Sequence, residues 1–319
     1  MRYIFVVNGS PDKAFVLEEV KQQLAEVHID HELYVTTGVG DGTRFVRIWC
    51  DLHRGVKACF VSCGGSGTAN EVASGIIGFH DKYMAYMALC GTNDFCKYYP
   101  NVDFTSLKKI LEGEPVAIDI LRANDSYALN MINVGFTASA AAEGNRYIEE
   151  GKSHPYERGI ARVLFTARYH HITIKADGRQ LGTRALQMCD LANGHFTGGK
   201  YNTAPQASNV DGLMDITLIR PMFLPIFFYT LPHYTSGKHF EKKFLRHWIK
   251  YGQAKHVELT SRNLITIALD GEIIAGTSIT VDVLPKAIQI IMPKVDETIG
   301  DETNTECENK GLYKRNNHV

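Results

Sequence analysis

Hydrophobic residues follow two different rhythms along the chain, and the change falls near residue 115. Up to residue 112, short runs of β-branched and aromatic residues alternate with stretches in which apolar residues recur every three or four positions. In Phe15–Val27, for example, Val16, Val20 and Leu24 fall on one helical face. We predict strands at Tyr3–Val7, Glu32–Thr36, Ala58–Cys63 and Met84–Leu89, and helices at Phe15–Val27, Thr43–His53, Ala69–Phe79 and Ser106–Glu112. This alternation is typical of a doubly wound α/β domain, a parallel sheet with helices on its faces.

After Pro115, apolar residues tend to recur at every second position, which is the pattern of half-buried β-strands. The pair Asp177-Gly178 lies between two such runs and is a common two-residue hairpin turn. One helical insert is predicted around Glu157–Arg168. Strands are expected at Val116–Leu121, Tyr127–Val134, His171–Ala176, Arg184–Leu191, Met214–Ile219, Leu264–Leu269 and Ser278–Leu284. The second part of the chain is therefore predicted to be a β-rich domain.

The change of rhythm divides the chain into three predicted parts. Residues 1–118 form the α/β domain, and residues 119–295 form the β-rich domain. From Asp296 to Glu308 the chain has several acidic residues, no basic residue and almost no apolar one. Such a composition cannot bury a core, so residues 296–319 are predicted to be a disordered acidic tail.

Polar and glycine-rich segments follow four successive strands of the predicted α/β domain. They are Asn8-Gly9-Ser10, Thr36-Thr37-Gly38, Gly64–Thr68 and Gly91–Asp94. Ligands of parallel sheets bind at the carboxyl ends of the strands, where all four segments would meet. Gly64–Thr68 also precedes a helix, and the N–H groups at a helix start favour phosphate. On its own, this segment fits a tight structural turn as well as it fits a nucleotide phosphate site.

The composition is that of an ordinary globular protein. Of the 319 residues, 45% are hydrophobic and 22% are charged, and the formal net charge is -1. This balance gives no support for general nucleic-acid binding. The seven cysteines include no CxxC pair and lie mostly in apolar segments, which indicates buried thiols in a reducing compartment and argues against a zinc site. The first residues form a strand pattern rather than a signal peptide, so we expect a cytoplasmic protein.

The longest apolar run is Met222–Leu231. It is interrupted by Pro225 and is about half the ~20 residues that a membrane-spanning helix needs. Two interpretations stay open: a buried or half-buried helix, and a surface that contacts lipid. The second is supported by cations that follow the run, at Lys238, Lys242, Lys243, Arg246 and Lys250.

Several motifs resemble those of one enzyme family in both sequence and order. Gly64–Val72, GGSGTANEV, resembles the GGDGTxNEV signature of the bacterial diacylglycerol kinase-like lipid kinases. Gly91–Phe95 is similar to the family's GTxNDF segment with one residue missing, and Asn130–Phe136 is similar to the strand that opens its second domain. The remaining similar segments are Gly198–Pro205, Val210–Asp215 and Leu269–Glu272. The resemblance covers nearly the whole chain, to about residue 293.

The resemblance implies a nucleotide-binding α/β domain followed by a β-sandwich, with the active site in the cleft between them. The implied activity is ATP- and Mg²⁺-dependent phosphorylation of a lipid hydroxyl, in diacylglycerol or a related lipid. We expect contact with this lipid at the inner membrane surface, and the sequence leaves the oligomeric state open, a homodimer included. The implied nucleotide contacts are Asn8, Thr36, Gly64, Gly65, Ser66, Gly67, Thr68, Ala69, Asn70, Glu71 and Thr92.

Asp270-Gly271-Glu272 places two carboxylates on either side of a glycine. If this segment ends a strand, the two side chains point to one side, and the proximity of like charges could raise one pKa enough for proton acceptance. From the residues alone, an exposed β-turn is the simpler interpretation. By resemblance, we expect Glu272 to be the base that takes the proton of the lipid hydroxyl, with Asp270 as its partner.

The segment Val210–Asp215 also has two interpretations, the first of which is a plain turn into a strand. The resemblance implies instead a structural Mg²⁺. This ion would be held by the carboxylate of Asp211 and by the backbone carbonyls of Ser208 and Leu213, an all-oxygen set that suits it. Asp215 is a second candidate ligand.

Two places depart from the family pattern. The first loop, Asn8–Lys13, has Gly9 where relatives have proline, so no role is assigned to Lys13. The acidic residue of the GGDGT signature is Ser66 here, and a serine adds no negative charge beside a phosphate-bound Mg²⁺. A catalytically weak protein that binds nucleotide and lipid is therefore an alternative. A kinase of the NAD kinase group is a further alternative, against which the apolar run and Asp270–Glu272 argue.

Overall fold

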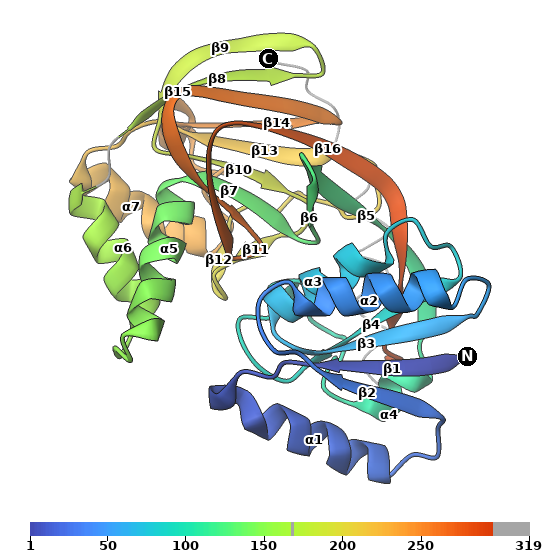
Figure 1. The fold of residues 1–319 in the computed structure, drawn as a ribbon. Helices are drawn as coiled ribbons and strands as arrows, with labels where there is room; N and C mark the ends of the chain where they lie inside the picture. The colour runs from blue at the N-terminus through green and yellow to red at the C-terminus, as the bar shows by residue number, and fades with distance from the viewer. Residues whose placement is uncertain (167–168, 296–319) are drawn as a thin grey trace.

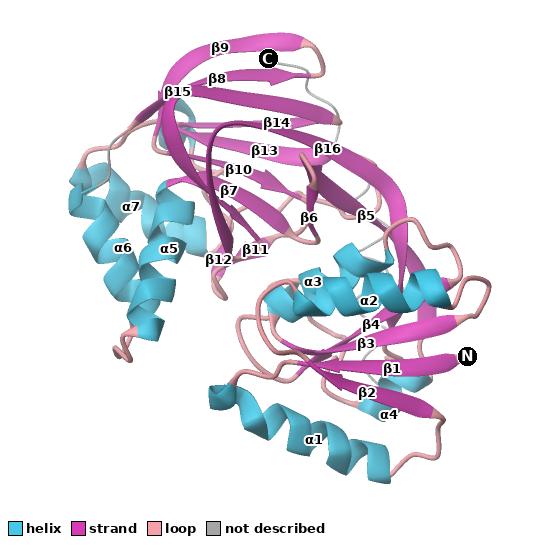
Figure 2. Cartoon of the chain, viewed as in Figure 1, coloured by secondary structure: helices cyan, strands magenta, loops and turns pink. Residues whose placement is uncertain are grey.

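The computed structural model of the protein describes residues 1–166 and 169–295. Helices and strands alternate in the first part of the chain, and strands dominate the second part (Figure 2). The predicted acidic tail, residues 296–319, lies outside the described residues.

The first part of the chain is a parallel sheet with helices on both faces (Figure 1). The sheet order is β2-β1-β3-β4, formed by β1 (Arg2–Val7), β2 (His31–Val35), β3 (Ala58–Gly64) and β4 (Lys82–Ala88). One face is covered by α2 (Asp41–Leu52) and α3 (Ser66–Ile76), and the other by α1 (Ala14–Ala25) and α4 (Leu107–Leu111). The predicted doubly wound α/β fold is confirmed.

The helices bury the faces that the sequence pattern marks. In α1, Val16, Val20 and Leu24 are buried and pack in one cluster with Phe5 of β1. Full burial of a Val or Leu side chain stabilises a fold by about 1.5–3 kcal/mol. The apolar spacing in α1 is therefore what fixes this helix to the sheet.

The second part of the chain is a β-sandwich whose strands enclose a large apolar core. Its central strands lie in the order β14-β13-β10-β7-β15-β16, and they are antiparallel to one another. Two-residue turns with positive φ, Asp177-Gly178 and Asp270-Gly271, join β8 to β9 and β15 to β16. The strands are β5 (Glu114–Ala123), β6 (Ser126–Ala128), β7 (Met131–Gly135), β8 (His170–Ala176), β9 (Arg179–Leu186), β10 (Met188–Ala192), β13 (Met214–Ile219), β14 (Ile249–Ala254), β15 (His256–Leu269) and β16 (Glu272–Met292), with the small ribbon β11 (Phe196–Thr197) and β12 (Tyr201–Asn202).

The last strand connects the two parts of the molecule. Over its first half β16 pairs with β15 in the sandwich, and over residues 289–291 it pairs in parallel with residues 83–85 of β4. The sandwich and the α/β sheet are therefore joined in one continuous sheet. The predicted division at residue 118 omits this return of the chain, because a strand pattern gives no sign of which sheet a strand joins.

Three helices pack outside the sandwich, where the sequence pattern predicted one insert. They are α5 (Phe136–Glu149), α6 (Pro155–Thr166) and α7 (Leu224–Thr235). The missed helix, α5, is rich in alanine and has few large apolar residues. Its small residues allow close packing, since a Cβ atom on Gly144 would lie 2.5 Å from the Tyr156 ring and one on Gly159 would lie 2.5 Å from the Ala140 carbonyl oxygen.

The long apolar run forms a half-buried helix. In α7, Thr230 and Tyr234 are buried, whereas Phe228 and Tyr229 are exposed, as is Phe223 just before the helix. No helix among the described residues is long and apolar enough to cross a membrane. The first interpretation of this run is confirmed, and contact with lipid stays a prediction.

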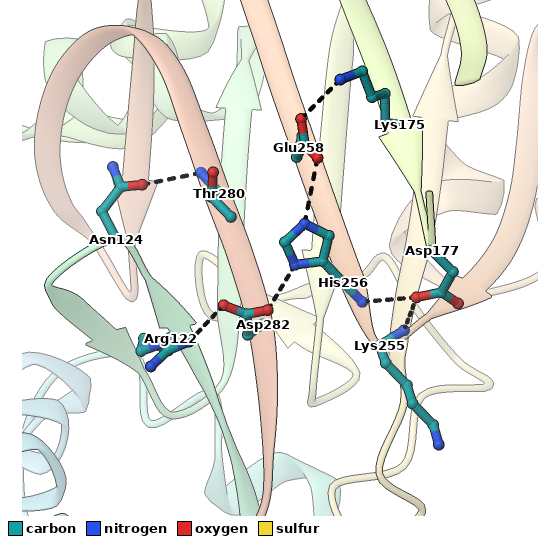
Figure 3. A network of polar contacts seen from close by, with 9 residues as sticks. All are labelled: Arg122, Asn124, Lys175, Asp177, Lys255, His256, Glu258, Thr280 and Asp282. Atoms are coloured by element: carbon teal, nitrogen blue, oxygen red, sulfur yellow. Dashed lines mark hydrogen bonds and ion pairs between the residues drawn. The ribbon is translucent and has the colours of Figure 1, made fainter. Parts of the chain in front are cut away.

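A chain of ion pairs and hydrogen bonds crosses four strands on the sandwich surface (Figure 3). Arg122 contacts Asp282 at 2.8 Å, and Asp282 contacts His256 Nδ1 at 2.6 Å. His256 Nε2 lies 3.5 Å from Glu258, which contacts Lys175 at 3.1 Å. The bond to Asp282 raises the pKa of His256, because it favours the charged imidazolium.

Candidate active site

A cavity of about 1270 Å³ lies where the carboxyl ends of the parallel strands face the sandwich. All four segments predicted to meet at this rim line it, through residues that include Asn8, Thr36, Ser66 and Thr92. The β15–β16 turn and helices α5, α6 and α7 line the other side. Apolar lining in that half includes Phe136, Ile160, Met222, Phe227 and Leu231. The cavity therefore joins a polar, glycine-rich half to a largely apolar half.

The glycines between β3 and α3 serve two purposes. A Cβ atom on Gly64 would lie 2.6 Å from the Thr68 hydroxyl oxygen, and one on Gly65 would lie 2.9 Å from the Cys90 carbonyl oxygen. Gly67, in the first turn of α3, has no atom within 4 Å of its Cβ position. Close packing thus requires the first two glycines, whereas Gly67 leaves the helix start open to an anion.

The predicted nucleotide contacts divide by their position. Nine of them line the cavity, but Gly64 and Ala69 do not, and both are buried in the turn beneath it. The lining loops are connected to one another, since the Asn8 amide donates to the Thr68 hydroxyl at 3.1 Å and the Gly9 N–H donates to the Thr36 hydroxyl at 3.2 Å. We therefore infer that Gly64 and Ala69 shape the connection between β3 and α3 and do not contact the nucleotide directly.

Asn70 and Glu71 line the cavity but use their side chains to hold other segments. The Asn70 amide donates to the Tyr127 carbonyl at 3.0 Å and accepts from the Leu129 N–H at 3.1 Å. Both carboxylate oxygens of Glu71 accept from N–H groups at the start of α2, at 2.8 Å each. Asn70 connects α3 to the second part of the chain, and Glu71 connects α3 to α2, so both are positioning residues.

Ser66 faces the turn that follows β4. Its hydroxyl oxygen lies 3.3 Å from Thr92 Oγ1 and accepts from the Asp94 N–H at 3.3 Å. Thr92 Oγ1 in turn donates to the Asp94 carboxylate at 3.3 Å. The side chain that replaces the acidic residue of the family signature is therefore directed toward another carboxylate.

Asp94 is a candidate that the sequence interpretation did not select. It is 8% exposed, lines the cavity and accepts from the Gly199 N–H at 2.7 Å. Burial raises the pKa of its carboxyl group. The available signal was its position directly after Gly91-Thr92-Asn93, at the end of a strand.

Asp270 is both a turn residue and a cavity residue. It adopts φ 48° in the β15–β16 turn, while its carboxylate accepts from the N–H groups of Leu129, Asn130 and Met131 at 2.6–3.2 Å. Burial, with a smaller contribution from the nearby Asp94, raises the pKa of Asp270 to about 6, although the three N–H groups act in the opposite direction. The two interpretations of this segment are therefore compatible.

Glu272 begins β16 and is exposed at the cavity. The carboxylate of Asp270 is directed to the backbone at residues 129–131 instead of to Glu272. The predicted pairing of the two carboxylates is therefore absent from their hydrogen bonds in the described chain. The pKa of Asp270 is raised by burial first and by the charge of Asp94 second. The sequence pattern instead suggested that the two carboxylates of this segment act on each other.

The predicted metal loop, with Ser208, Asp211 and Leu213, lies before β13 and outside this cavity. Asp211 accepts from the Leu213 N–H at 3.0 Å, and burial together with the nearby Asp119 raises the pKa of its carboxyl group. Asp119 accepts from the Gly212 N–H at 2.7 Å. Asp211 and Asp119 are therefore close enough to interact, and ligation of Mg²⁺ by Asp211 with the Ser208 and Leu213 carbonyls stays a prediction.

Asp215 fits this role less well. It is buried in β13, where it accepts from the Tyr251 hydroxyl and from the Gln253 amide. Burial raises its pKa to about 6. Among the described residues, no group of three or more His, Cys, Asp or Glu side chains could hold a metal ion. The implied set around Asp211 needs only one carboxylate, since its other ligands are backbone carbonyls.

Two family models match the chain. The diacylglycerol kinase catalytic domain matches residues 2–123, and the YegS C-terminal NAD kinase beta sandwich-like domain matches residues 130–292. A curated relative from Yersinia enterocolitica, described as "Probable lipid kinase YegS-like", is 26% identical over 307 residues, which are 93% of this chain and 99% of the relative. A relative of the same description from Shewanella frigidimarina is 29% identical over 241 residues, which are 72% of this chain and 75% of the relative.

Solved structures share the fold. A diacylglycerol kinase from Bacillus anthracis strain Sterne matches with a TM-score of 0.64 at 17% identity, covering 91% of this chain and 96% of that chain. Yeast NADH kinase in complex with NADH matches with a TM-score of 0.50 at 14% identity, covering 100% of this chain and 90% of that chain. At these identities the likeness concerns the fold alone.

Proposed function

The chain belongs to the diacylglycerol kinase-like lipid kinases, and from this premise we propose that it transfers the terminal phosphoryl group of ATP to a lipid hydroxyl. The observation that carries the proposal is that an open helix start, carboxylates and an apolar lining meet in one cavity. A phosphate-binding half and a lipid-binding half in one cavity are what such a transfer needs.

ATP phosphates are assigned to the polar half. The start of α3, Thr68 and Thr92 all line this half, and Gly67 leaves space at the helix start. Hydrogen bonds and the helix dipole stabilise negative charge there. This arrangement holds the transferred phosphoryl group at the boundary with the apolar half.

Glu272 is the proposed base. It is exposed to the cavity, so its carboxylate can accept the proton of the lipid hydroxyl while that oxygen attacks phosphorus and ADP leaves. Asp270 is less suited to this step, because its oxygens already accept from three backbone N–H groups. We propose that Asp270 holds the segment of residues 129–131 in place.

Mg²⁺ is the proposed cofactor, and when bound it spreads the charge that develops on the phosphoryl group. Asp94 lines the cavity and would contribute a carboxylate oxygen to such an ion, whereas the oxygens of Asp270 already accept from three backbone N–H groups. Asp211, with the Ser208 and Leu213 carbonyls, would hold a separate structural ion. Ser66 would leave the cavity site with less negative charge than the family signature provides.

Contact with the membrane is proposed for the end of the molecule that carries α7. Phe223, Phe228 and Tyr229 are exposed there, and Phe244 in the following 3₁₀ segment is 55% exposed. Lys243 begins this segment, Lys243–His247, and Lys242 directly precedes it. Aromatic and cationic side chains together are typical of a surface that binds anionic lipid.

The test is transfer of labelled phosphate from ATP, with and without Mg²⁺, to a panel of diacylglycerol, monoacylglycerol, sphingoid base, ceramide and NAD. Transfer to a lipid that needs Mg²⁺ and is lost in Glu272→Gln supports the proposal. Transfer to NAD alone would overturn it in favour of the NAD kinase alternative.

Ser66 favours a second candidate, a protein that binds ATP and lipid with little transfer. Saturable ATP binding without measurable phosphorylation of any lipid in the panel would support it. Ser66→Asp, examined in the same assay, distinguishes a site that lacks one charge from a site built for binding alone.

A further inference from the structure

A buried carboxylate lies behind the apolar half of the cavity. Asp190 of β10 is fully buried, and its two carboxylate oxygens accept from the Tyr234 hydroxyl at 2.6 Å and from the Asn133 amide at 2.7 Å. Tyr234 and Asn133 both line the cavity, whereas Asp190 lies behind them. Apolar neighbours in this half include Met188, Ile219 and Phe227. A polar group in such surroundings is costly unless it is satisfied, so its presence needs an explanation.

Strand alternation explains why these side chains face the cavity. Ile132 and Val134 of β7 belong to the sandwich core, so Asn133 points to the opposite side of the sheet. On β10, Cys189 and Leu191 belong to the same core, and Asp190 lies directly opposite Asn133 in the antiparallel pair. The sheet itself therefore places the carboxylate behind the amide.

The hydrogen-bond directions leave acceptors facing the cavity. Burial raises the pKa of Asp190 to about 6, so at pH 8 it is ionised and can only accept. Tyr234 then donates its single hydroxyl hydrogen to Asp190, so its oxygen, which has the Thr137 and Thr203 hydroxyl groups as hydrogen-bonding neighbours, can only accept from a ligand. Asn133 must donate its NH₂ group, so its carbonyl oxygen faces the other way and accepts from Thr197 at 3.2 Å. A ligand group that contacts the Tyr234 oxygen would therefore have to be a hydrogen-bond donor.

Asn133 and Tyr234 lie within reach of the β15–β16 turn, where we place phosphoryl transfer. Asn133 is two residues beyond Met131, whose N–H group binds Asp270, and two residues along a strand span about 7 Å. A lipid whose reacting hydroxyl lies beside the β15–β16 turn can therefore place a neighbouring group of its polar head at Tyr234 and Asn133.

We infer that Tyr234 and Asn133, held by Asp190, form a subsite for a hydrogen-bond donor of the acceptor lipid, a second hydroxyl or an amino group near the hydroxyl that is phosphorylated. The inference rests on the proposed lipid kinase function and narrows its substrate class. Monoacylglycerol and sphingoid bases carry such a donor. Diacylglycerol does not, because its remaining oxygens are ester oxygens, which only accept.

The experiment compares 1-monooleoylglycerol with its 2-O-methyl ether in the same detergent micelles at pH 8. Methylation removes the donor without adding a second acyl chain. The wild-type protein is expected to prefer the free hydroxyl by about 3- to 10-fold in kcat/KM, the usual contribution of one hydrogen bond. Tyr234→Phe should reduce this preference toward 1.

Tyr251→Phe is the matched control. Its hydroxyl also donates to a buried aspartate, Asp215, but Tyr251 does not line the cavity. The control should keep the wild-type lipid preference. Loss of the preference in both variants would overturn the subsite, because the cause would then be a general disturbance of the sandwich.

A binding measurement separates this inference from the proposed function. The shift of the unfolding temperature that each lipid causes is recorded without ATP, and the free hydroxyl should stabilise the wild-type protein more. If no lipid is phosphorylated but the free hydroxyl still stabilises the protein more than the methyl ether does, the proposed kinase function is refuted and the subsite is retained. Equal shifts and equal transfer rates for the two lipids would refute the subsite, whether or not the variants fold.

Discussion

Replacement of Ser66 by aspartate places a second negative charge beside Asp94. Ser66 Oγ and the Asp94 carboxylate each lie 3.3 Å from Thr92 Oγ1. A carboxylate at position 66 would therefore lie within about 7 Å of Asp94, where two unit charges at an effective dielectric constant of about 20 repel by about 2–3 kcal/mol. Asp94 is largely buried, so water screens this repulsion little.

We expect Ser66→Asp to lower the free energy of unfolding by about 2–3 kcal/mol at pH 8 without Mg²⁺. Ser66→Asn is the control, because it adds similar volume without charge. Mg²⁺ with a non-hydrolysable ATP analogue should stabilise the aspartate variant more than the asparagine variant, since the ion offsets the repulsion. With saturating Mg²⁺ and ATP, the aspartate variant should also have a higher kcat than the wild type.

The measurements are denaturant unfolding with and without Mg²⁺ and nucleotide, and labelled-phosphate transfer with nucleotide affinity measured separately. Equal stability of the two variants under all conditions would show that position 66 does not face Asp94 as described. A fall in both kcat and nucleotide affinity for Ser66→Asp would refute the view that the site lacks one charge, and would favour a site rebuilt around serine.

Four further changes test other parts of the structure. Glu272→Gln should reduce transfer by about 10²–10⁴-fold with nucleotide affinity nearly intact, and wild-type turnover would exclude Glu272 as the base. Asp211→Ala should lower the unfolding temperature in Mg²⁺ and remove most of the stabilisation that Mg²⁺ gives; identical Mg²⁺ titrations of variant and wild type would contradict the structural ion. The pKa of Asp190 in the folded protein is about 6, above the usual value, so its contribution to stability is present below pH 4 and lost as the pH rises through 6. Relative to Asp190→Asn, the free energy of unfolding of the wild type should fall by about 3 kcal/mol between pH 4 and 7. Parallel pH profiles of the two proteins would refute this. The raised pKa of His256 has the same sign, so its stabilisation through Asp282 should be present below about pH 6.5 and lost as pH rises through the raised pKa, and His256→Gln should flatten the unfolding profile in that range.

Local patterns determined most of the α/β half from sequence. Apolar residues at helical spacing, as in Val16, Val20 and Leu24, mark a face that must be buried, and glycine-rich segments after strands must lie at one rim of a parallel sheet. The Asp-Gly pairs were legible as hairpin turns for the same reason, because the turn depends on two adjacent residues.

The arrangement of the carboxylates could not be predicted from local pattern. Asp270 binds the backbone at residues 129–131, and Asp94 binds Gly199, across distances of more than a hundred residues in sequence. The sequence interpretation paired Asp270 with Glu272 because they are neighbours in the chain, whereas the turn directs the Asp270 side chain elsewhere.

The sequence by itself determined which elements form, where ligands can gather, and the family to which the motifs point, because these follow from spacing and residue type along the chain. The tertiary structure alone decided that β16 returns to β4, that Ser66 faces Asp94, and that Asp190 lies behind Asn133 and Tyr234. These contacts depend on strand order and on the register between distant strands; a one-residue shift of β7 or β10, for example, would turn Asn133 or Asp190 to the opposite face of the sheet.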